Sequence, residues 1–558
     1  MPAAAAHRCS TALARPWPAA HGGSSRCFYD RAAMLISRRD AVRRLSGTAL
    51  LLAAGRLRSS ESPSQMRLPS TPPRFDRYPF TLGIASGQPR PDSVVLWTRL
   101  APEPHADGGG MDPLPLPLRW EMAHDEAFTQ PVRTGEVVAL PSLAHSVRVQ
   151  VDRLPPGRVF HYRFITGNAV SPIGRTRTAP PADSQPARLR LALASCQHYE
   201  QGRFTVHREI AASDLDLVLF VGDYVYDSSN PSFLRRPHEG PAPETLDQFR
   251  ARHATYKLDH DLQAAHAAHP WILAWDDHEV RNDYAAALGT GELSAAEFVS
   301  IRAAAYQAYF EHLPLALDQF PGERGMRMHD RYTWGRLAEL WTLDGRQHRS
   351  VQACNAADES GGHLRWHCDE LADRHRTMLG PAQENWLHRG LAHSQRRWKL
   401  IGQATQMSAS GLETLGRQLV HTDGWDGYAS SRARLLQHLV DSGVQDVVAL
   451  GGDVHRHVAA NLRVRPNDER SAVVASEFVT TSLTTRGIPE SWMSLIRSSN
   501  PDILHGRSDE RGYALIELGN QSLHLTARAT GFPVTESSLL HTQASYSVES
   551  GRAGPRPA

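Results

Sequence analysis

The chain has 558 residues, more than one hydrophobic core normally fills, so two or more domains are expected. Hydrophobic residues make up 41% of it and charged residues 22%, which are ordinary values for a globular protein. The net charge of +2 argues against a nucleic-acid-binding scaffold, which would need a concentrated excess of basic residues.

The amino-terminal residues lack the hydrophobic periodicity of a folded domain. Residues 1–33 are rich in Ala, Pro, Arg and Ser, which predicts a disordered segment or a start assigned too early, with Met34 as the initiator. Residues 34–58 combine Arg38 and Arg39 with a later apolar stretch of roughly ten residues, as secretory signals do. The arginine pair predicts export by the twin-arginine machinery; an accidental pair in an Arg-rich chain is the alternative. We therefore expect an exported protein, periplasmic, extracellular or associated with the cell envelope, with no transmembrane segment.

The next part of the chain has an all-β pattern. Residues 59–76, rich in Pro and Ser, are a predicted linker. Residues 77–180 contain short apolar or alternating runs separated by turn residues, namely 93–97, 118–122, 146–151 and 159–164. Several short strands at such spacing predict a small β-sandwich domain.

From residue 187 apolar strands alternate with helical patterns, which is typical of a layered α/β domain with helices on both faces of its β-sheet. The predicted strands are 189–194, 215–221, 271–275, 398–401 and 447–450, and the predicted helices are 295–313, 381–393 and 430–442. Residues 513–518 and 522–527 predict a hairpin near the end of this domain, which we bound at 187–548. Residues 549–558 are rich in Gly, Arg and Pro and are expected to be disordered.

Four of the predicted strands are followed by side chains that can bind metals. Because groups at the carboxyl ends of strands meet in one crevice of an α/β sheet, these side chains are expected to surround a shared pair of ions. The alternatives are local: a turn at Asp223, a solvated acidic turn at Asp277, and a small buried hydrophobe at Cys196. The expected ligands are Cys196, Asp223, Tyr226, Asp277, Asn282, Asp453 and His455.

The residue types indicate particular roles. Asp223 can bridge two cations, and Tyr226 needs a strong Lewis acid such as ferric iron to lose its phenolic proton near neutral pH. His278 is predicted to be the proton donor or a phosphate contact, because imidazole titrates near neutral pH. Arg281 and Arg456 stand beside ligand blocks and are candidate phosphate contacts; in each case an ordinary surface arginine is the alternative.

These motifs resemble those of the PhoD-like alkaline phosphatases, a branch of the calcineurin-like metallophosphoesterase superfamily that is similar to purple acid phosphatases. Gly222-Asp223-Tyr224-Val225-Tyr226 fits a Gly-Asp-x-x-Tyr signature, residues 275–279 fit an Asp-Asp-His-Glu block, and residues 452–455 fit a Gly-Asp-x-His block. The resemblance covers residues 77–548 and implies a metallophosphoesterase core preceded by an all-β domain. It also implies a ferric ion (Fe3+) held by Cys and Tyr, with calcium (Ca2+) beside it.

Two departures from the wider superfamily bear on the metals. Its opening Asp-x-His is Ser195-Cys196-Gln197 here, so that Cys196 would replace a carboxylate or imidazole. The segment 402–406, where a histidine ligand would stand, supplies only amides and a hydroxyl. Oxygen-rich coordination with few histidines suits calcium better than zinc.

The expected function is that of an exported, metal-dependent phosphohydrolase, in which a metal-bound hydroxide attacks a phosphate ester at a dinuclear or trinuclear site. One alternative is a phosphodiesterase of the same fold, acting on phospholipids or teichoic-acid-like polymers. The other is a non-catalytic cell-surface binding protein with a structural metal site. Cys354 and Cys368 could form a disulfide in an exported protein, which would leave Cys196 unpaired and in need of a metal.

Overall fold

The computed structural model describes residues 73–558, except 230, 239, 292, 324, 357–359, 367 and 415–416. The predicted leader (1–33 and 34–58) and the linker as far as residue 72 lie outside the described residues. Within the described part of the chain, no helix is long and apolar enough to cross a membrane.

Two large sheets form the centre of the fold. The first contains, in spatial order, β25 (Arg552–Pro557), β24 (His541–Glu549), β23 (Ser522–Gly531), β22 (Glu510–Leu518), β9 (Leu189–Ala194), β10 (Leu217–Val221), β11 (Pro270–Ala274), β1 (Ile84–Gly87), β2 (Ser93–Arg99) and β5 (Ser146–Asp152). The second contains β12 (Asp330–Trp334), β13 (Ala338–Thr342), β15 (Trp398–Gly402), β18 (Val447–Gly451), β20 (Val473–Val479), β19 (His457–Arg463) and β21 (Ile503–Arg507). Parallel pairs (β9 to β11, and β13 to β20 through β15 and β18) occupy the middle of each sheet.

The two sheets pack face to face through aliphatic side chains. Leu193 of β9 and Leu219 of β10 lie in one buried cluster with Leu400 of β15 and Leu450 of β18. All residues of β10 and of β18 are buried, because helices cover the outer face of each sheet. Burial on both faces explains why these strands read as continuous apolar runs rather than alternating ones.

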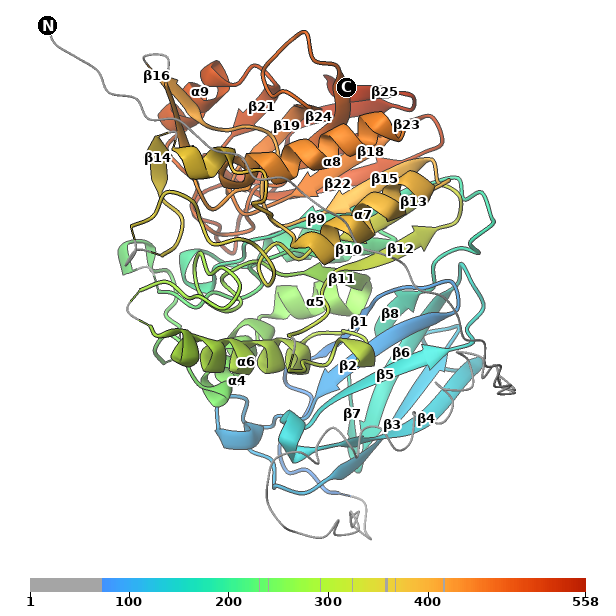
Figure 1. The fold of residues 1–558 in the computed structure, drawn as a ribbon. Coiled ribbons are helices and arrows are strands. Elements are labelled where there is room, and N and C mark those ends of the chain that lie inside the picture. The colour runs from blue at the N-terminus through green and yellow to red at the C-terminus, as the bar shows by residue number, and fades with distance from the viewer. Residues whose placement is uncertain are drawn as a thin grey trace, which may run out of the picture. The chain divides into compact units, whose positions relative to one another are not determined.

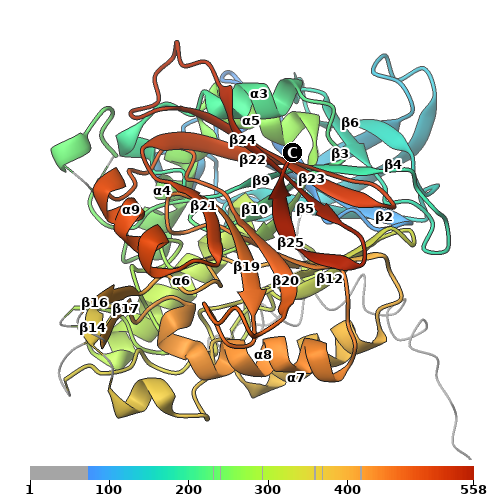
Figure 2. The same ribbon diagram turned by 90° about the horizontal axis from the view of Figure 1, so that it is seen from above.

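Helices form the two outer layers, as the view from above shows (Figure 2). The first sheet is covered by α3 (Val206–Ala212), α4 (Leu246–Lys257), α5 (His260–Ala268) and α6 (Ala295–His312), and the second by α7 (Pro381–His393) and α8 (Ala429–Asp441). Helix α6 begins where Ser294 and Glu297 form a capping box, which satisfies free amides of its first turn. The prediction of a layered α/β core with helices on both faces is confirmed.

The amino-terminal β region is continuous with the first sheet (Figure 1). Strand β1 pairs in parallel with β11, so that Gly87 lies opposite Trp271, and β2 and β5 extend the sheet beyond it. A smaller sheet packs on these strands through residues such as Leu96 and Phe160. It consists of β4 (Pro131–Ala139), β3 (Leu116–Ala123), β6 (Val159–Thr166), β7 (Ala169–Val170) and β8 (Gly174–Arg177). The all-β sandwich therefore shares one of its sheets with the α/β core.

Two further elements complete the described chain. Helix α9 (Glu490–Ser499) lies beside a small sheet formed by β14 (Leu364–Trp366), β17 (Arg417–His421) and β16 (Leu412–Thr414). The tail 549–558, expected to be disordered, instead forms strand β25 against β24. Gly551 turns the chain with a φ of 80°, and Asp446 accepts hydrogen bonds from the Gly551 amide at 2.6 Å and from Ser550 at 2.9 Å. These contacts are made with residues about a hundred positions earlier, so no local pattern predicts them.

Candidate metal centre

Four strands end at one place although they belong to two sheets. The first sheet carries β9, β10 and β11, and the second carries β18. The turns after these strands contain the predicted ligands Cys196, Asp223, Tyr226, Asp277, Asp453 and His455.

Two glycines allow the turns to approach one another closely. A Cβ at Gly452 would lie 2.4 Å from Ser195 Oγ, which is closer than real side chains come. Gly222 has a φ of 113°, and a Cβ there would lie 2.7 Å from Asp276 Cβ. The glycine of each Gly-Asp pair thus lets the following carboxylate reach the crevice.

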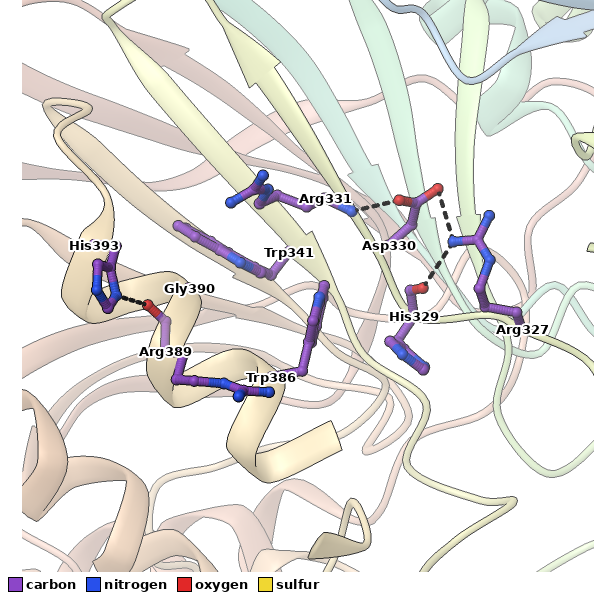
Figure 3. Close-up of a pocket in the computed structure, with 9 residues that line it drawn as sticks. All are labelled: Arg327, His329, Asp330, Arg331, Trp341, Trp386, Arg389, Gly390 and His393. Atoms are coloured by element: carbon purple, nitrogen blue, oxygen red, sulfur yellow. Dashed lines mark hydrogen bonds and ion pairs between the residues drawn. The ribbon is translucent and has the colours of Figure 1, made fainter. Parts of the chain in front are cut away.

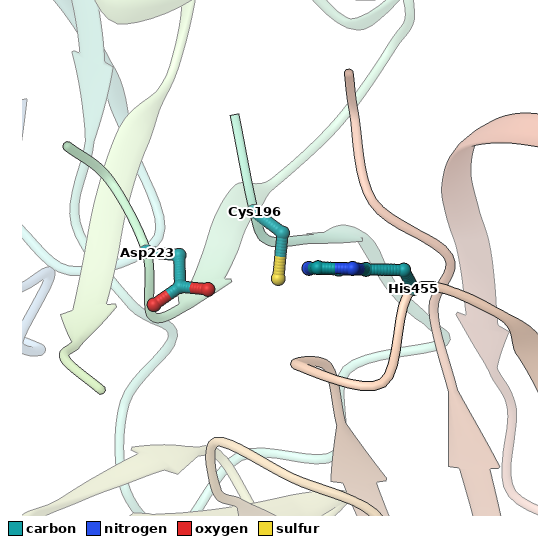
Figure 4. Close-up of side chains that lie close together, drawn as sticks. All are labelled: Cys196, Asp223 and His455. Atoms are coloured by element: carbon teal, nitrogen blue, oxygen red, sulfur yellow. The ribbon is translucent and has the colours of Figure 1, made fainter. Parts of the chain in front are cut away.

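Cys196, Asp223 and His455 form the first group of candidate ligands. One ligand atom from each lies within 4.8 Å of the others. Figure 4 shows the Cys196 sulfur between the Asp223 carboxylate and the His455 ring, on three separate segments of chain. The Tyr226 hydroxyl donates to Asp223 Oδ2 at 3.0 Å and lies 3.4 Å from His455 Nε2. Thr485 donates to the Tyr226 oxygen at 2.8 Å and so fixes the position of the phenol.

Asp223 also belongs to a second group, with Asp277 and His278, whose ligand atoms again lie within 4.8 Å of one another. Asp453 lies near enough to Asp277 for the two carboxylates to interact. Burial, and then the nearby Asp277 carboxylate, raise the pKa of Asp453. Asp223 is therefore shared between two adjoining sets of donors, as a carboxylate that bridges two cations would be.

The electrostatics of these groups fit bound cations. Within the described chain, Asp223 Oδ1 and Asp277 Oδ1 are buried and accept no hydrogen bond, which is costly unless an ion replaces the missing donors. Burial raises the pKa of Asp223 well above its usual range. Burial and the Asp223 carboxylate likewise raise the pKa of the Cys196 thiol. A cation between these groups would favour their ionised forms, so the residues present fit a metal centre.

His278 is held by a carboxylate of its own. Its Nδ1 lies 2.6 Å from Asp227 Oδ1, which leaves the other ring nitrogen for the crevice. Burial alone would lower the pKa of His278, but Asp277, Asp223 and Asp227 outweigh it and raise that pKa well above the usual value. Its ring also lies 4.2 Å from that of Tyr226, measured between centroids. Asp227 therefore fixes the orientation of the imidazole.

A buried arginine that sequence reasoning missed lies between the acidic residues and offsets their mutual repulsion. Arg346 forms ion pairs with Asp276, with Asp277 at 3.5 Å and with Asp423 at 2.9 Å. Burial would raise the pKa of Asp277, but Arg346 outweighs it and keeps that pKa below its usual value. Arg346 follows strand β13. Its place after a fifth strand was the one feature of the sequence that could have indicated a role at the site. In an Arg-rich chain that signal does not stand out.

The remaining predicted site residues lie in different surroundings. Arg456 is buried, and its Nε and one terminal nitrogen donate to Gln406 Oε1 at 3.0 and 2.8 Å. Arg281 has Nε and one terminal nitrogen without a hydrogen-bond acceptor among the described residues, with Glu244 only at 3.9 Å. Asn282 is exposed to solvent, unlike the buried groups around Asp223.

Two more buried side chains at the site escaped the sequence analysis. The His198 ring lies 4.4 Å from that of Tyr226, and its Nδ1 accepts from the Glu200 amide at 3.2 Å. Arg511 lies behind the first group and donates to the His455 carbonyl oxygen at 3.1 Å. Arg511 comes from strand β22, more than fifty residues from any motif, so only the fold brings it here.

Of the three cysteines in the described chain, two form a disulfide and one is free. Cys354 and Cys368 form a disulfide, with their Cα atoms 6.3 Å apart. Cys196 is the free cysteine of the described chain and is buried. A thiol at the meeting point of the strands, rather than in a disulfide, is available to a metal.

Comparisons with known proteins show the family to which the chain belongs. Residues 191–527 match the family model for PhoD-like phosphatase, and residues 65–180 match the model for its N-terminal domain. Alkaline phosphatase D of Bacillus subtilis (strain 168) is 39% identical over 492 residues, which cover 87% of this chain and 83% of that protein. A solved structure of PhoD superimposes with a TM-score of 0.83 at 38% identity, covering 87% of this chain and 93% of that one. PhoD-like phosphatases are metal-dependent enzymes. The chain belongs to the PhoD-like phosphatase family and is a phosphoric-ester hydrolase.

Proposed function

We propose that the chain hydrolyses phosphate esters at a centre of two metal ions that share Asp223. The observation that carries this proposal is that the Asp223 carboxylate belongs to both groups of ligand atoms, each within 4.8 Å. The ligands on one side are Cys196, Tyr226 and His455, and those on the other are Asp277 and Asp453. Asn282 is left out of the set because it is exposed.

The donor types support different ions on the two sides. Thiolate, phenolate and imidazole around Cys196 suit ferric iron, whereas the carboxylates around Asp277 suit calcium. When bound, the two ions would neutralise phosphoryl charge and make water a stronger nucleophile at neutral pH.

The protein's own groups orient the substrate and supply a proton. His278, oriented by Asp227, donates a proton to the leaving oxygen of the ester. Arg281 binds the phosphoryl group or its neighbour, since its guanidinium retains hydrogen-bond donors that no described acceptor uses. Arg456, whose donors serve Gln406, positions the turn that carries Asp453.

Export is part of the proposal. The arginine pair Arg38 and Arg39 before an apolar stretch supports passage through the twin-arginine machinery, which carries folded proteins. The disulfide between Cys354 and Cys368 supports an oxidising compartment such as the periplasm or the cell exterior.

The experiment compares Asp223→Asn with the wild-type chain, using p-nitrophenyl phosphate and bis(p-nitrophenyl) phosphate. Turnover of the preferred ester should fall at least about a hundredfold, because both ions lose a shared ligand. The matched control is Asp509→Asn, an exposed carboxylate paired with Arg507, which should keep its turnover. If Asp223→Asn keeps wild-type turnover of both esters, the two-ion centre is wrong. The ratio of monoester to diester turnover also gives the ester preference of the wild-type chain.

A further inference from the structure

A cleft of about 590 Å³ lies between strands β12 and β13 and helix α7, away from the metal centre (Figure 3). None of the proposed metal ligands lines it. Its volume is within the range of pockets that hold small organic molecules. Its walls are made of arginines, histidines and two tryptophans, with Asp330 as the acidic residue among them.

The cleft has three arginines, and carboxylates pair with two of them. Arg327 is paired with Asp318 at 2.8 Å and Asp330 at 3.4 Å, and Arg331 with Glu339 at 3.3 Å. Arg389 is exposed, and its Nε donates to the Asn385 carbonyl oxygen at 3.2 Å.

No carboxylate of the described chain forms an ion pair with Arg389. Its terminal nitrogens are therefore free to bind an anion.

The cleft also offers a flat apolar surface. Trp386 is half-buried, and its ring meets that of His329 edge to face, with 4.9 Å between the ring centroids. One face of an indole in such a position can pack against the ring of a ligand. Trp386 and Arg389 are three residues apart on α7, so they lie on neighbouring positions of the same helix face.

Trp341 and Gly390 form part of the inner wall of the cleft. Trp341 is fully buried, and among the described residues its indole Nε1 has no acceptor. Gly390 lies directly over this nitrogen: a Cβ there would be 2.8 Å from Nε1. A glycine inside a helix is destabilising by about 1 kcal/mol relative to alanine, so a reason for it is needed. Here the glycine lets helix α7 pack closely against the indole of Trp341.

We propose that this cleft binds a small organic anion in which a sulfate, phosphate or carboxylate group is carried on a flat ring. Arg389 binds the anionic group, and the ring packs against Trp386. The ring can be aromatic or a hexose, since an aromatic face and the C–H face of a hexose both pack against an indole. The site is additional to the hydrolytic centre and does not depend on the metal assignment.

The test is calorimetric titration of the full chain with glucose 6-sulfate, phenyl sulfate and sodium sulfate. Sulfate esters are used because a phosphatase would consume the corresponding phosphates. At least one ring-bearing sulfate should bind about tenfold or more tightly than inorganic sulfate, and the two ester probes distinguish a sugar from an aromatic ligand. Arg389→Gln should weaken this binding about tenfold, the effect of losing a charge-assisted hydrogen bond. Trp386→Leu should remove the preference for a ring.

Matched controls come from an exposed pair elsewhere, Arg417 and Trp366, whose guanidinium and ring lie 5.1 Å apart. Arg417→Gln and Trp366→Leu should leave binding unchanged, and all four variants should keep turnover of p-nitrophenyl phosphate. Equal affinity for the three probes would overturn the proposal. So would unchanged binding in both cleft variants, because the sulfates would then occupy another site such as the metal centre.

Discussion

Asp223 belongs to both groups of candidate ligands. It has a φ of 57°, in the left-handed region that a non-glycine residue rarely adopts. Cys196, Asp453 and His455 share this conformation, with φ values of 59°, 60° and 52°. Such backbone conformations cost on the order of 1–3 kcal/mol each and occur where a site requires them. Their concentration at four predicted ligands is independent support for a common role.

His278 is tested by changing the leaving group. His278→Gln should lower turnover of an alkyl phosphate about a hundredfold or more, because a poor leaving group needs a proton from a general acid. Turnover of p-nitrophenyl phosphate should fall much less, since nitrophenolate leaves without one. Steady-state kinetics on the two esters gives the comparison, with the exposed His524→Gln as the control. Equal losses on both esters would show that His278 does not supply the proton.

At the residue scale, sequence reasoning could propose only groups that stand in motifs, and it missed those that meet across the fold. Asp223 and Asp277 directly follow predictable strands. Arg346 and Asp423, by contrast, are 77 positions apart and meet only in the folded chain. Composition also does not show burial: Asn282 is exposed, whereas Arg456 is buried and donates to Gln406.

Among the elements, the loop closed by the disulfide supports the site from one side. The Gly362 amide in this loop donates to Asp283 Oδ2 at 3.0 Å, and the Asp283 amide donates to Asp277 Oδ2 at 2.7 Å. The loop between Cys354 and Cys368 is thus connected to a proposed metal ligand through two hydrogen bonds. A cross-link that fixes this loop is expected to stabilise both the fold and the position of Asp277.

Removal of the disulfide should therefore be measurable. Replacing Cys354 and Cys368 together by serine should lower the free energy of unfolding by up to about 3 kcal/mol, as expected for a loop with a sequence separation of 14. Chemical denaturation with and without a reductant measures the effect. The wild-type chain should be destabilised by the reductant and the double variant should not. A wild-type chain that is indifferent to the reductant would contradict a stabilising disulfide.

Some elements have the bounds that the sequence predicts. The predicted strand 189–194 and helix 381–393 coincide with β9 and α7. Strand pairing could not be derived in the same way, because periodicity describes one segment at a time. The tail strand β25 was missed for the same reason: its Gly- and Pro-rich sequence is held by β24 and by Asp446.

On the scale of the whole molecule, the fold joins two sheets so that their strand ends meet. The sequence predicted a single crevice in one α/β sheet, whereas Asp223 and His455 approach it from different sheets. The amino-terminal β region extends the first sheet through β1, so it belongs to the same folding unit. Stability of the site is thus tied to the packing of the entire described chain.

Buried histidines make that stability depend on pH. His253 is fully buried against the His312 ring, at 4.9 Å between centroids, and neither of its ring nitrogens has a partner in the described chain. Burial, reinforced by Lys257, Arg99 and Arg252, lowers its pKa to about 3. The unfolded chain, with a histidine pKa near 6.5, binds the proton first, so acid favours unfolding between about pH 6.5 and 3.

His253→Phe should reduce this acid sensitivity. The difference in unfolding free energy between pH 7.5 and pH 5.0 should shrink by about 2 kcal/mol, because the unfolded state no longer gains that proton. Urea denaturation at the two pH values measures it, with exposed His524→Phe as the control. An unchanged difference would mean that His253 is protonated in the folded chain.

The pair of ions is tested most directly by measuring metal content together with the visible absorption spectrum of the purified chain. Phenolate bound to ferric iron absorbs visible light, so the wild-type protein should contain iron and calcium and be coloured. Tyr226→Phe should remain folded and lose the absorption band. A colourless wild-type protein containing zinc alone, or an unchanged band in Tyr226→Phe, would contradict the proposed centre.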